Sequence, residues 1–244
     1  MIGKGLVTAL ISLAVFATDA SAMDKAFSTL PFAKRLTLAT AGDNAAKLAV
    51  GESYETANGV KLNILEAAKW YRQAALAGQL EAQYRLALII EKGGPGLKPD
   101  LNAARKLLQA AANKGHGPSQ LLYGQRLYRG EGIAKDEKIA AVYIRKAAEQ
   151  GLAVAQNVHG SMLLHGWGQE RNLDEAFKWF TKAADQGDLL AMNNLGGMFE
   201  NGWGTAKDQA KAVEQYQRSA AKGNEIARKN LERLGLPLPP VSNL

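Results

Sequence analysis

The sequence predicts an all-α fold in which helical hairpins stack as repeats. Three observations support this prediction. A glycine recurs every 36 or 37 residues, an Asn or Asp stands 15 residues before five of these glycines, and apolar residues lie at helical spacing between them. A fixed period of about 20–50 residues is the sequence signature of a repeat architecture. The recurring glycines are Gly42, Gly78, Gly115, Gly151, Gly187 and Gly223.

Each repeat is expected to finish with a helix of about 14 residues that its glycine terminates. An Asn or Asp side chain at a helix start accepts a backbone N–H that otherwise has no partner. The glycine at the other end supplies the left-handed backbone conformation that follows many helices. Apolar residues 11, 7–8 and 3–4 positions before each glycine share one face of this helix. The expected N-cap residues are Asn63, Asp100, Asp136, Asn172 and Asp208.

Another helix is expected directly after each glycine. Small residues recur four and nine positions after the glycine, and large residues recur at eight and twelve. The small residues allow a neighbouring helix to approach closely, and a Gly-rich turn such as Gly166-Trp167-Gly168 follows. One hairpin cannot bury the apolar faces of both its helices, so the hairpins must stack on one another.

The two ends of the pattern are expected to cap the stack. Residues 23–42 predict an N-terminal capping helix with Pro31 near its start, a position that suits proline. Residues 43–223 hold five repeats, and residues 224–244 predict a capping helix with a charged outer face. The Pro-rich tail is expected to leave this last helix as an extended segment.

Residues 1–22 fall outside the repeats and are typical of a bacterial secretory signal peptide. Lys4 supplies a positive n-region, the run from Leu6 to Ala17 is apolar, and Ala20-Ser21-Ala22 is an A-x-A-like cleavage signal. A membrane anchor is the alternative, but the run is shorter than the roughly 20 residues that span a bilayer. The sequence therefore predicts cleavage after Ala22 and a periplasmic or secreted mature chain without a transmembrane segment.

Composition narrows the choice of partners. The chain has no cysteine, so neither a disulfide nor a cysteine-linked lipid anchor is expected. Net charge is +7, and residues 79–115 carry six Lys or Arg against three Asp or Glu. Such a balance suits an acidic protein or an anionic glycan, although ordinary surface charge explains it equally well. An exported chain rarely meets nucleic acid, so no nucleic-acid partner is expected.

The repeats resemble the Sel-1-like repeat family, which is related to the tetratricopeptide repeat. The resemblance rests on Leu195-Gly196-Gly197-Met198-Phe199, on Gly202-Trp203-Gly204 and on the run from Ala176 to Gly187, and it covers residues 43–223. The first repeat departs from the pattern, with Ala57 in place of a turn glycine. The resemblance implies a right-handed α-solenoid with a concave groove lined by the first helices. It also implies a scaffold or adaptor, in bacterial envelopes often one in regulation, secretion, polysaccharide handling or host contact.

If the groove follows the tetratricopeptide pattern, residues 6, 10, 13 and 14 positions after each glycine line it. Apolar side chains on a solvent face are a usual mark of a binding surface, and the alternative is that these residues pack between helices. Trp167 and Trp203 occupy equivalent turns, where they either bind a partner or pack over their own turn. The predicted groove residues are Tyr84, Leu88, Lys92, Leu121, Gln125, Tyr128, Arg129, Asn157, Ser161, Leu164, His165 and Asn193.

No metal, cofactor or catalytic site is expected. His159 and His165 are six residues apart, with no carboxylate at ligand spacing and no thiol. His159 takes a position that Leu or Tyr holds in other repeats, so it is expected to be a buried, hydrogen-bonded core residue. The serines show no Ser/His/Asp arrangement, and the glycine turns lack the Lys-Ser ending of a phosphate-binding loop.

Three functions are open on these grounds. The leading hypothesis is an exported scaffold that binds a protein or peptide in its groove, in envelope regulation or secretion. The alternative is a cell-wall or polysaccharide-associated protein, conceivably with hydrolytic activity. A third possibility is a homo-oligomeric scaffold with a purely structural role.

Overall fold

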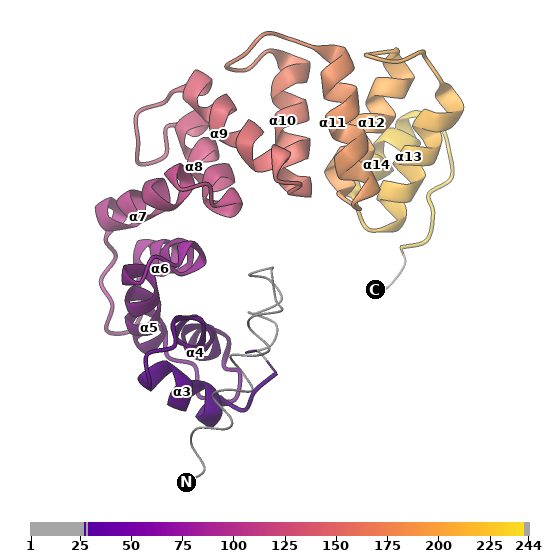
Figure 1. Ribbon diagram of the computed structural model, residues 1–244. Helices are drawn as coiled ribbons and strands as arrows, with labels where there is room; N and C mark the ends of the chain where they lie inside the picture. Colours follow the sequence, from indigo (N-terminus) through magenta and orange to yellow (C-terminus); the bar gives the residue numbers. More distant parts are fainter. Residues whose placement is uncertain (1–26, 28, 242–244) are drawn as a thin grey trace, which may run out of the picture. The chain divides into compact units, whose positions relative to one another are not determined.

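The computed structural model describes residue 27 and residues 29–241, which contain twelve α-helices and no β-strand (Figure 1). The expected signal peptide lies outside these residues. The chain divides into two compact units, unit 1 up to Ala111 and unit 2 from Ala112. The all-α prediction of stacked hairpins is confirmed, because consecutive helices pack against each other in both units.

Ten of the helices have the same length. Helices α4 to α13 contain 13 residues each, and the shorter α3 and α14 stand at the two ends of the series. Unit 1 holds α3 (Phe32–Thr40), α4 (Asn44–Thr56), α5 (Ile64–Leu76), α6 (Leu80–Lys92) and most of α7 (Leu101–Asn113). Unit 2 holds α8 (Gly117–Arg129), α9 (Glu137–Glu149), α10 (Ala153–His165), α11 (Leu173–Asp185), α12 (Leu189–Asn201), α13 (Gln209–Ala221) and α14 (Glu225–Arg233).

The helix ends follow the predicted signals. Each of the five expected N-cap side chains accepts the backbone N–H three residues further on, at 2.9–3.1 Å. The six recurring glycines have φ between 89° and 103°, so they adopt the positive-φ conformation expected after a helix. Local sequence therefore sets where the second helix of each repeat begins and ends.

The first repeat ends its first helix without glycine. Ala57 follows α4 in the left-handed conformation, with φ 59° and ψ 31°. Gly130, Gly166 and Gly202 hold the equivalent positions after α8, α10 and α12. Among the described residues, no other non-glycine has positive φ. A left-handed L-residue costs roughly 1–2 kcal/mol, so this turn carries strain that those repeats avoid.

In four of the five hairpins, the second helix lays a large side chain over a glycine of the first. Four glycines have this environment, and a Cβ added to any of them would lie 2.6–2.9 Å from a side-chain atom of the partner helix. The predicted close approach at the ninth position is therefore confirmed. The pairs are Gly51 with Tyr71, Gly124 with Ile144, Gly160 with Phe180 and Gly196 with Tyr216. The second repeat has Ala87 and Leu108 at these two positions, and both are buried.

Neighbouring hairpins of unit 2 meet at the Gly-rich turns. A Cβ at Gly168 would overlap the carbonyl oxygen of Glu137 at the start of α9, and a Cβ at Gly204 would overlap that of Leu173 at the start of α11. Each turn thus lies directly on the preceding hairpin, which only a residue without a side chain permits.

Glutamine side chains in unit 2 join the two helices of a hairpin and also bind the helix that precedes it. Gln150 Nε2 donates to Gln120 Oε1, and Gln186 Nε2 donates to Gln156 Oε1, both at 2.7 Å. The acceptors Gln120 and Gln156 are buried, and each donates in turn to the carbonyl of an alanine near the end of the preceding helix, at 3.1 and 3.3 Å. These pairs were not predicted from the sequence, although Gln recurs five residues after three of the glycines.

The predicted departure of the Pro-rich tail is wrong. Leu236 and Leu238 pack against the cluster that contains Tyr216 and Leu231, and Arg228 Nη1 donates to Pro239 O at 3.4 Å. The tail therefore covers apolar surface of the last two helices.

Adding one methyl group under an aromatic ring of the core should destabilise the fold. We expect Gly160→Ala to lower the free energy of unfolding by about 1–3 kcal/mol, because its Cβ would lie 2.9 Å from the Phe180 ring. Adding Phe180→Leu reproduces the natural pair of the second repeat and should restore part of the loss. Urea unfolding of both single variants and the double variant measures the coupling. Strict additivity would contradict this account of the packing.

Candidate functional site

The twelve predicted groove residues are divided between the two units. Tyr84, Leu88 and Lys92 lie on α6 in unit 1, and the other nine lie on α8, α10 and α12 in unit 2. Three of the twelve are exposed (Lys92, Arg129 and His165), eight are half-buried, and Asn157 is buried. The expectation of a solvent-facing side chain is therefore wrong for Asn157, which is 6% exposed.

Unit 2 brings four of the predicted residues together around one cavity. Its volume is ≈ 130 Å³, well below the roughly 300 Å³ at which small-molecule sites begin. A cavity of this size suits a single side chain of a partner. The lining comprises the predicted Gln125, Tyr128, Arg129 and Ser161, together with Ile144, Val158, Met162 and Trp167.

Aromatic rings form one wall of this cavity. The Trp167 ring stacks on His165 with centroids 4.4 Å apart and lies 5.5 Å from the Tyr128 ring. Trp167 nevertheless remains 38% exposed, so it both packs over its turn and offers part of its face. Trp203 has the same exposure in the equivalent turn but does not line the cavity.

The cavity lies between consecutive hairpins, and the repeat pattern explains its position. Tyr128 stands in the last turn of α8, and Trp167 stands in the turn after α10. The backbone N–H of Trp167 donates to Met162 O at 3.0 Å, and Gly168 places the turn directly on α9. The aromatic wall is thus held by main-chain contacts on both sides of Trp167.

Carboxylates of the neighbouring turn accompany the cations around the cavity. Arg129 Nη1 lies 3.5 Å from Glu131 Oε1, and Lys135 Nζ lies 2.7 Å from Glu137 Oε1. The hydrogen bond that Lys135 donates to Glu137, and the negative charge of that carboxylate, raise the pKa of Lys135. Lys135 also lies 5.7 Å from the centre of the Tyr128 ring, within reach of a cation–π attraction. The surroundings therefore carry cations without a strong net positive field.

A larger hollow lies beside the cavity, between the turns that precede α9 and α11. Its volume is ≈ 620 Å³, and its lining carries both positive and negative side chains. The lining residues are Lys135, Asp136, Glu137, Lys138, Gly166, Gly168, Gln169 and Glu170. It lacks the aromatic surface that makes the smaller cavity the better binding site.

Two of the predicted asparagines join neighbouring first helices. Asn194 Nδ2 donates to Asn157 Oδ1, and Asn230 Nδ2 donates to Asn193 Oδ1, both at 2.9 Å. The pairs lie one repeat apart, between α10 and α12 and between α12 and α14. Sequence reasoning placed Asn157 and Asn193 in a groove and missed their partners. The available signal was Asn at the seventh position of the next unit in both cases.

His159 lies in the core, as predicted. Its ring is 2% exposed and packs edge-on against Trp179, with centroids 5.3 Å apart. The predicted hydrogen bonding is wrong for Nδ1, which is buried without a partner among the described residues. Burial, and to a smaller extent the positive charge of Arg145, lower the pKa of His159 to about 4. The imidazole is therefore neutral at pH 7.

The described residues contain no group of three His, Cys, Asp or Glu side chains that could hold a metal ion. The expectation that the chain has no metal site stays a prediction. In the same part of the chain, no helix is both long and apolar enough to cross a bilayer.

Hairpins of constant length, closed by glycines and joined through their turns, define an α-solenoid repeat protein. The Sel1 repeat family matches five consecutive segments, residues 45–79, 80–116, 117–152, 153–188 and 189–224. The chain therefore belongs to the Sel1 repeat family, as its resemblance indicated. Sel1 repeats commonly bind proteins and generally form non-catalytic scaffolds.

Solved structures of Sel1 repeat proteins resemble the chain. A protective antigen present in uropathogenic Escherichia coli strains is 28% identical with a TM-score of 0.77, over 86% of this chain and 46% of that one. The chain thus spans about half the length of the antigen. A Sel1 repeat protein from Oxalobacter formigenes is 28% identical with a TM-score of 0.73, over 83% and 89% of the two chains.

A more distant likeness shows the fold alone. An immunity protein from Pseudomonas aeruginosa is 21% identical with a TM-score of 0.53, over 91% of this chain and 89% of that one. No curated protein matches the sequence.

Acid should destabilise the protein through His159. The unfolded imidazole titrates near pH 6.5 and the folded one near 4, so between these values the unfolded state binds more protons. Stability that is present above pH 6.5 is lost as pH falls toward 4, by on the order of 2–3 kcal/mol.

His159→Leu should reduce this loss, because Leu195 fills the same position in the next repeat. The free energy of unfolding of both proteins is measured in urea at several pH values from 7 to 4. The difference between the two proteins removes the contribution of all other titrating groups, which they share. Parallel pH profiles would exclude His159 as a source of the acid sensitivity.

Proposed function

We propose that this chain is an exported scaffold that binds a protein or peptide partner through unit 2. The binding surface is the side of α8, α10 and α12 that carries the predicted groove residues. The observation that carries the proposal is the cavity with its wall of Tyr128 and Trp167. Membership of a family that commonly binds proteins supports it.

The cavity has the features of an anchor site in a protein interface. Tyr, Trp and Arg are the residues most enriched where interface binding energy concentrates, and all three line this cavity. Main-chain contacts hold the Trp167 turn, so a partner would lose little conformational entropy in ordering it. One apolar side chain of the partner would fill the cavity, and Arg129 and Lys135 would lie close to its neighbours.

Export is part of this proposal. The segment with Lys4, the apolar run and Ala20-Ser21-Ala22 supports secretion into the periplasm or beyond, where a partner in envelope regulation or secretion would be met. The likeness to a protective antigen of E. coli is consistent with a place outside the cytoplasm. Sequencing the N-terminus of the exported chain tests the assignment, and any start other than Met23 would contradict the proposed cleavage.

We assign no enzymatic activity and no cofactor to the chain. The lining of the cavity contains no carboxylate and no histidine, so it offers no acid–base pair for hydrolysis. The hydrolytic version of the polysaccharide hypothesis would need such a pair, and the cavity does not favour it.

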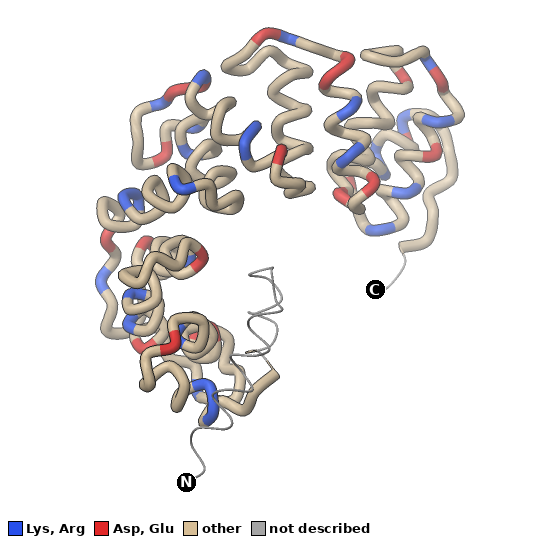
Figure 2. The backbone as a smooth tube through the Cα atoms, viewed as in Figure 1, with Lys and Arg blue, Asp and Glu red and all other residues tan. Residues whose placement is uncertain are grey.

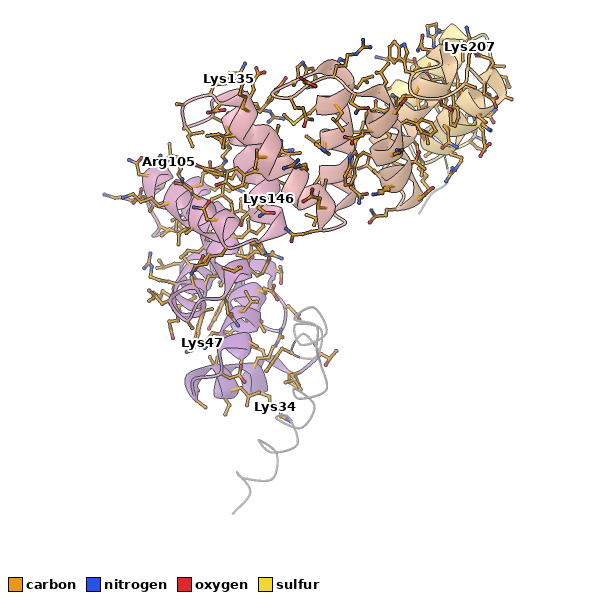
Figure 3. The ribbon with its side chains drawn as sticks, turned by 45° about the horizontal axis from the view of Figure 1, so that its top comes forward. Lys34, Lys47, Arg105, Lys135, Lys146 and Lys207 are labelled. Atoms are coloured by element: carbon orange, nitrogen blue, oxygen red, sulfur yellow. The ribbon has the colours of Figure 1, made fainter. Side chains whose placement is uncertain are left out.

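The anionic-glycan alternative rests on the positive charge of the chain. Within unit 2, Lys135 and Lys146 lie toward opposite ends of α9, and Lys207 precedes α13 (Figure 3). Glutamates or an aspartate accompany several other cations, among them Arg145, Lys211 and Arg233. Dispersed and paired cations attract a polyanion weakly, so a protein partner is favoured.

Removing the aromatic wall should weaken partner capture. In crosslinking followed by mass spectrometry of envelope extract, we expect Tyr128→Ala and Trp167→Ala to reduce partner recovery by about tenfold or more, as at interface hot spots. Trp203→Ala is the matched control, because Trp203 is equally exposed in the equivalent turn outside the cavity. Equal recovery by all three variants and the wild type would contradict the assignment. Salt-sensitive binding to anionic glycan without a protein partner would favour the alternative.

A further inference from the structure

The first helices of unit 2 present a patterned face beyond the cavity. This face, here called the amide face, lies on α10, α12 and α14. It comprises the residues that stand three, six, seven and ten positions after Gly151, Gly187 and Gly223. These spacings place the residues on one side of each helix. The two asparagine pairs form its middle, and Val154, Leu190 and Ile226 form a row at its edge. These three apolar residues stand 36 positions apart and are 52%, 49% and 53% exposed.

Each asparagine pair uses only half of its hydrogen-bonding capacity. In the pair between α12 and α14, Asn193 accepts and Asn230 donates. Asn193 Nδ2 and Asn230 Oδ1 then have no recorded hydrogen-bond partner among the described residues, and both side chains are half-buried. The pair of Asn157 and Asn194 repeats this arrangement one repeat earlier. The half-buried pair of Asn193 and Asn230 therefore offers one donor group and one acceptor, which is what a peptide main chain requires. In the other pair Asn157 is buried, so only the half-buried Asn194 is placed to meet a partner.

Stacking of the helices does not require these amides. Leu121 on α8 and Val158 on α10 occupy the equivalent two positions in the preceding pair of first helices. An apolar pair therefore serves at that position, and Val158 also lines the cavity. Partly satisfied amides contribute less to stability than a packed apolar pair, so their presence points to a role in recognition.

The amide face is almost uncharged at its centre. Helix α10 contains no Asp, Glu, Lys or Arg (Figure 2), and α12 contains only Glu200. Glu200 is already bound by Arg233 Nη2 at 2.7 Å and Tyr216 Oη at 2.8 Å. A charged partner would lose hydration here without meeting an opposite charge. The part of the face on α10 and α12 therefore complements an uncharged segment. Its two cations, Lys229 and Arg233, lie at one end on α14, and Arg233 is already paired with Glu200.

The repeat spacing also restricts the conformation of that segment. Neighbouring helices pack about 8–10 Å apart, and one turn of polyproline II spans about 9 Å in three residues. A segment in this conformation would present the same side to each repeat, whereas a β-strand alternates its sides every residue. Polyproline II also leaves its main-chain groups free for outside partners. The chain already packs its own tail, Pro237-Leu238-Pro239-Pro240, against α13 and α14.

We propose that the amide face binds an uncharged, proline-rich segment of a partner in the polyproline II conformation. Asn193, Asn194 and Asn230 hydrogen-bond its main chain, and every third side chain packs on the row of Val154, Leu190 and Ile226. This inference rests on the proposed function and names the chemistry of the partner segment, whose end reaches the cavity through Val158 and Ser161.

The test uses the full mature chain and a synthetic probe. The probe is an acetylated, amidated peptide of four Leu-Pro-Pro units, and its affinity is measured by isothermal titration calorimetry. The double variant Asn193→Leu/Asn230→Val replaces one amide pair with the residue types of the pair in α8 and α10. We expect about tenfold weaker binding, the loss of two net hydrogen bonds, with an unchanged melting temperature. Leu190→Glu and a Glu-Pro-Pro probe should each reduce binding by a similar or larger factor.

Several results would overturn this inference. They are failure of the wild-type chain to bind the probe, equal binding by the double variant, and equal binding of the Glu-Pro-Pro probe. Asparagine-dependent binding of maltoheptaose without peptide binding would assign the face to a neutral glycan instead. If partner capture through Tyr128 and Trp167 persists in any of these cases, the proposed function stands and only the segment chemistry is wrong. If that capture also fails, both proposals fall.

Discussion

The close contact of one large side chain with a helical glycine governs how most hairpins of this protein pack. Tyr71, Phe180 and Tyr216 rest on Gly51, Gly160 and Gly196, at a distance that leaves no room for a methyl group. This contact brings the two helices together and fixes their rotation, because only one face of the first helix has the glycine. The turns and inter-hairpin contacts then follow from helices whose separation is already set.

Local chemistry made much of the fold predictable. The Asn and Asp N-caps, the positive-φ glycines and the small residues at the ninth position act over a few residues, and a 36-residue period displays them in register. The course of the tail was not predictable in this way. Leu236 and Leu238 gain burial only against α13 and α14, so their position depends on a surface that the fold creates.

The candidate site could be predicted only in part. Counting from the glycines found Gln125, Tyr128, Arg129 and Ser161, but it could not show that they surround one cavity with Trp167. Counting also treated Asn157 and Asn193 as independent positions. Their hydrogen bonds join residues 37 positions apart, and a period of 36 aligns each asparagine with the residue beside its true partner. These contacts join position six of one repeat to position seven of the next, so comparing the same position in every repeat does not reveal them.

Recognition in such a chain must come from residues that the repeat does not dictate. The buried alanines and glycines recur because packing requires them in every unit. Tyr128, Trp167 and the paired asparagines vary between units, so they are free to meet a partner. In unit 2 the same helices carry both the recurring packing residues and the variable recognition residues. The packing residues fix each helix, and the helix in turn orients the recognition residues.

The glutamine pairs restrict the size of an insertion that the stack of repeats accepts. The segment from Leu152 to Gly187 contains the acceptor Gln156 and, at its other end, the donor Gln186. A tandem copy inserted after Gly187 would carry its own pair equivalent to Gln156 and Gln186, because both members lie within one repeat, so these amides would again have partners. Duplication of a whole unit is therefore chemically self-consistent here, whereas a shorter insertion would leave a buried amide unmatched. Evolution could thus lengthen the array in steps of one complete repeat, each step adding binding surface.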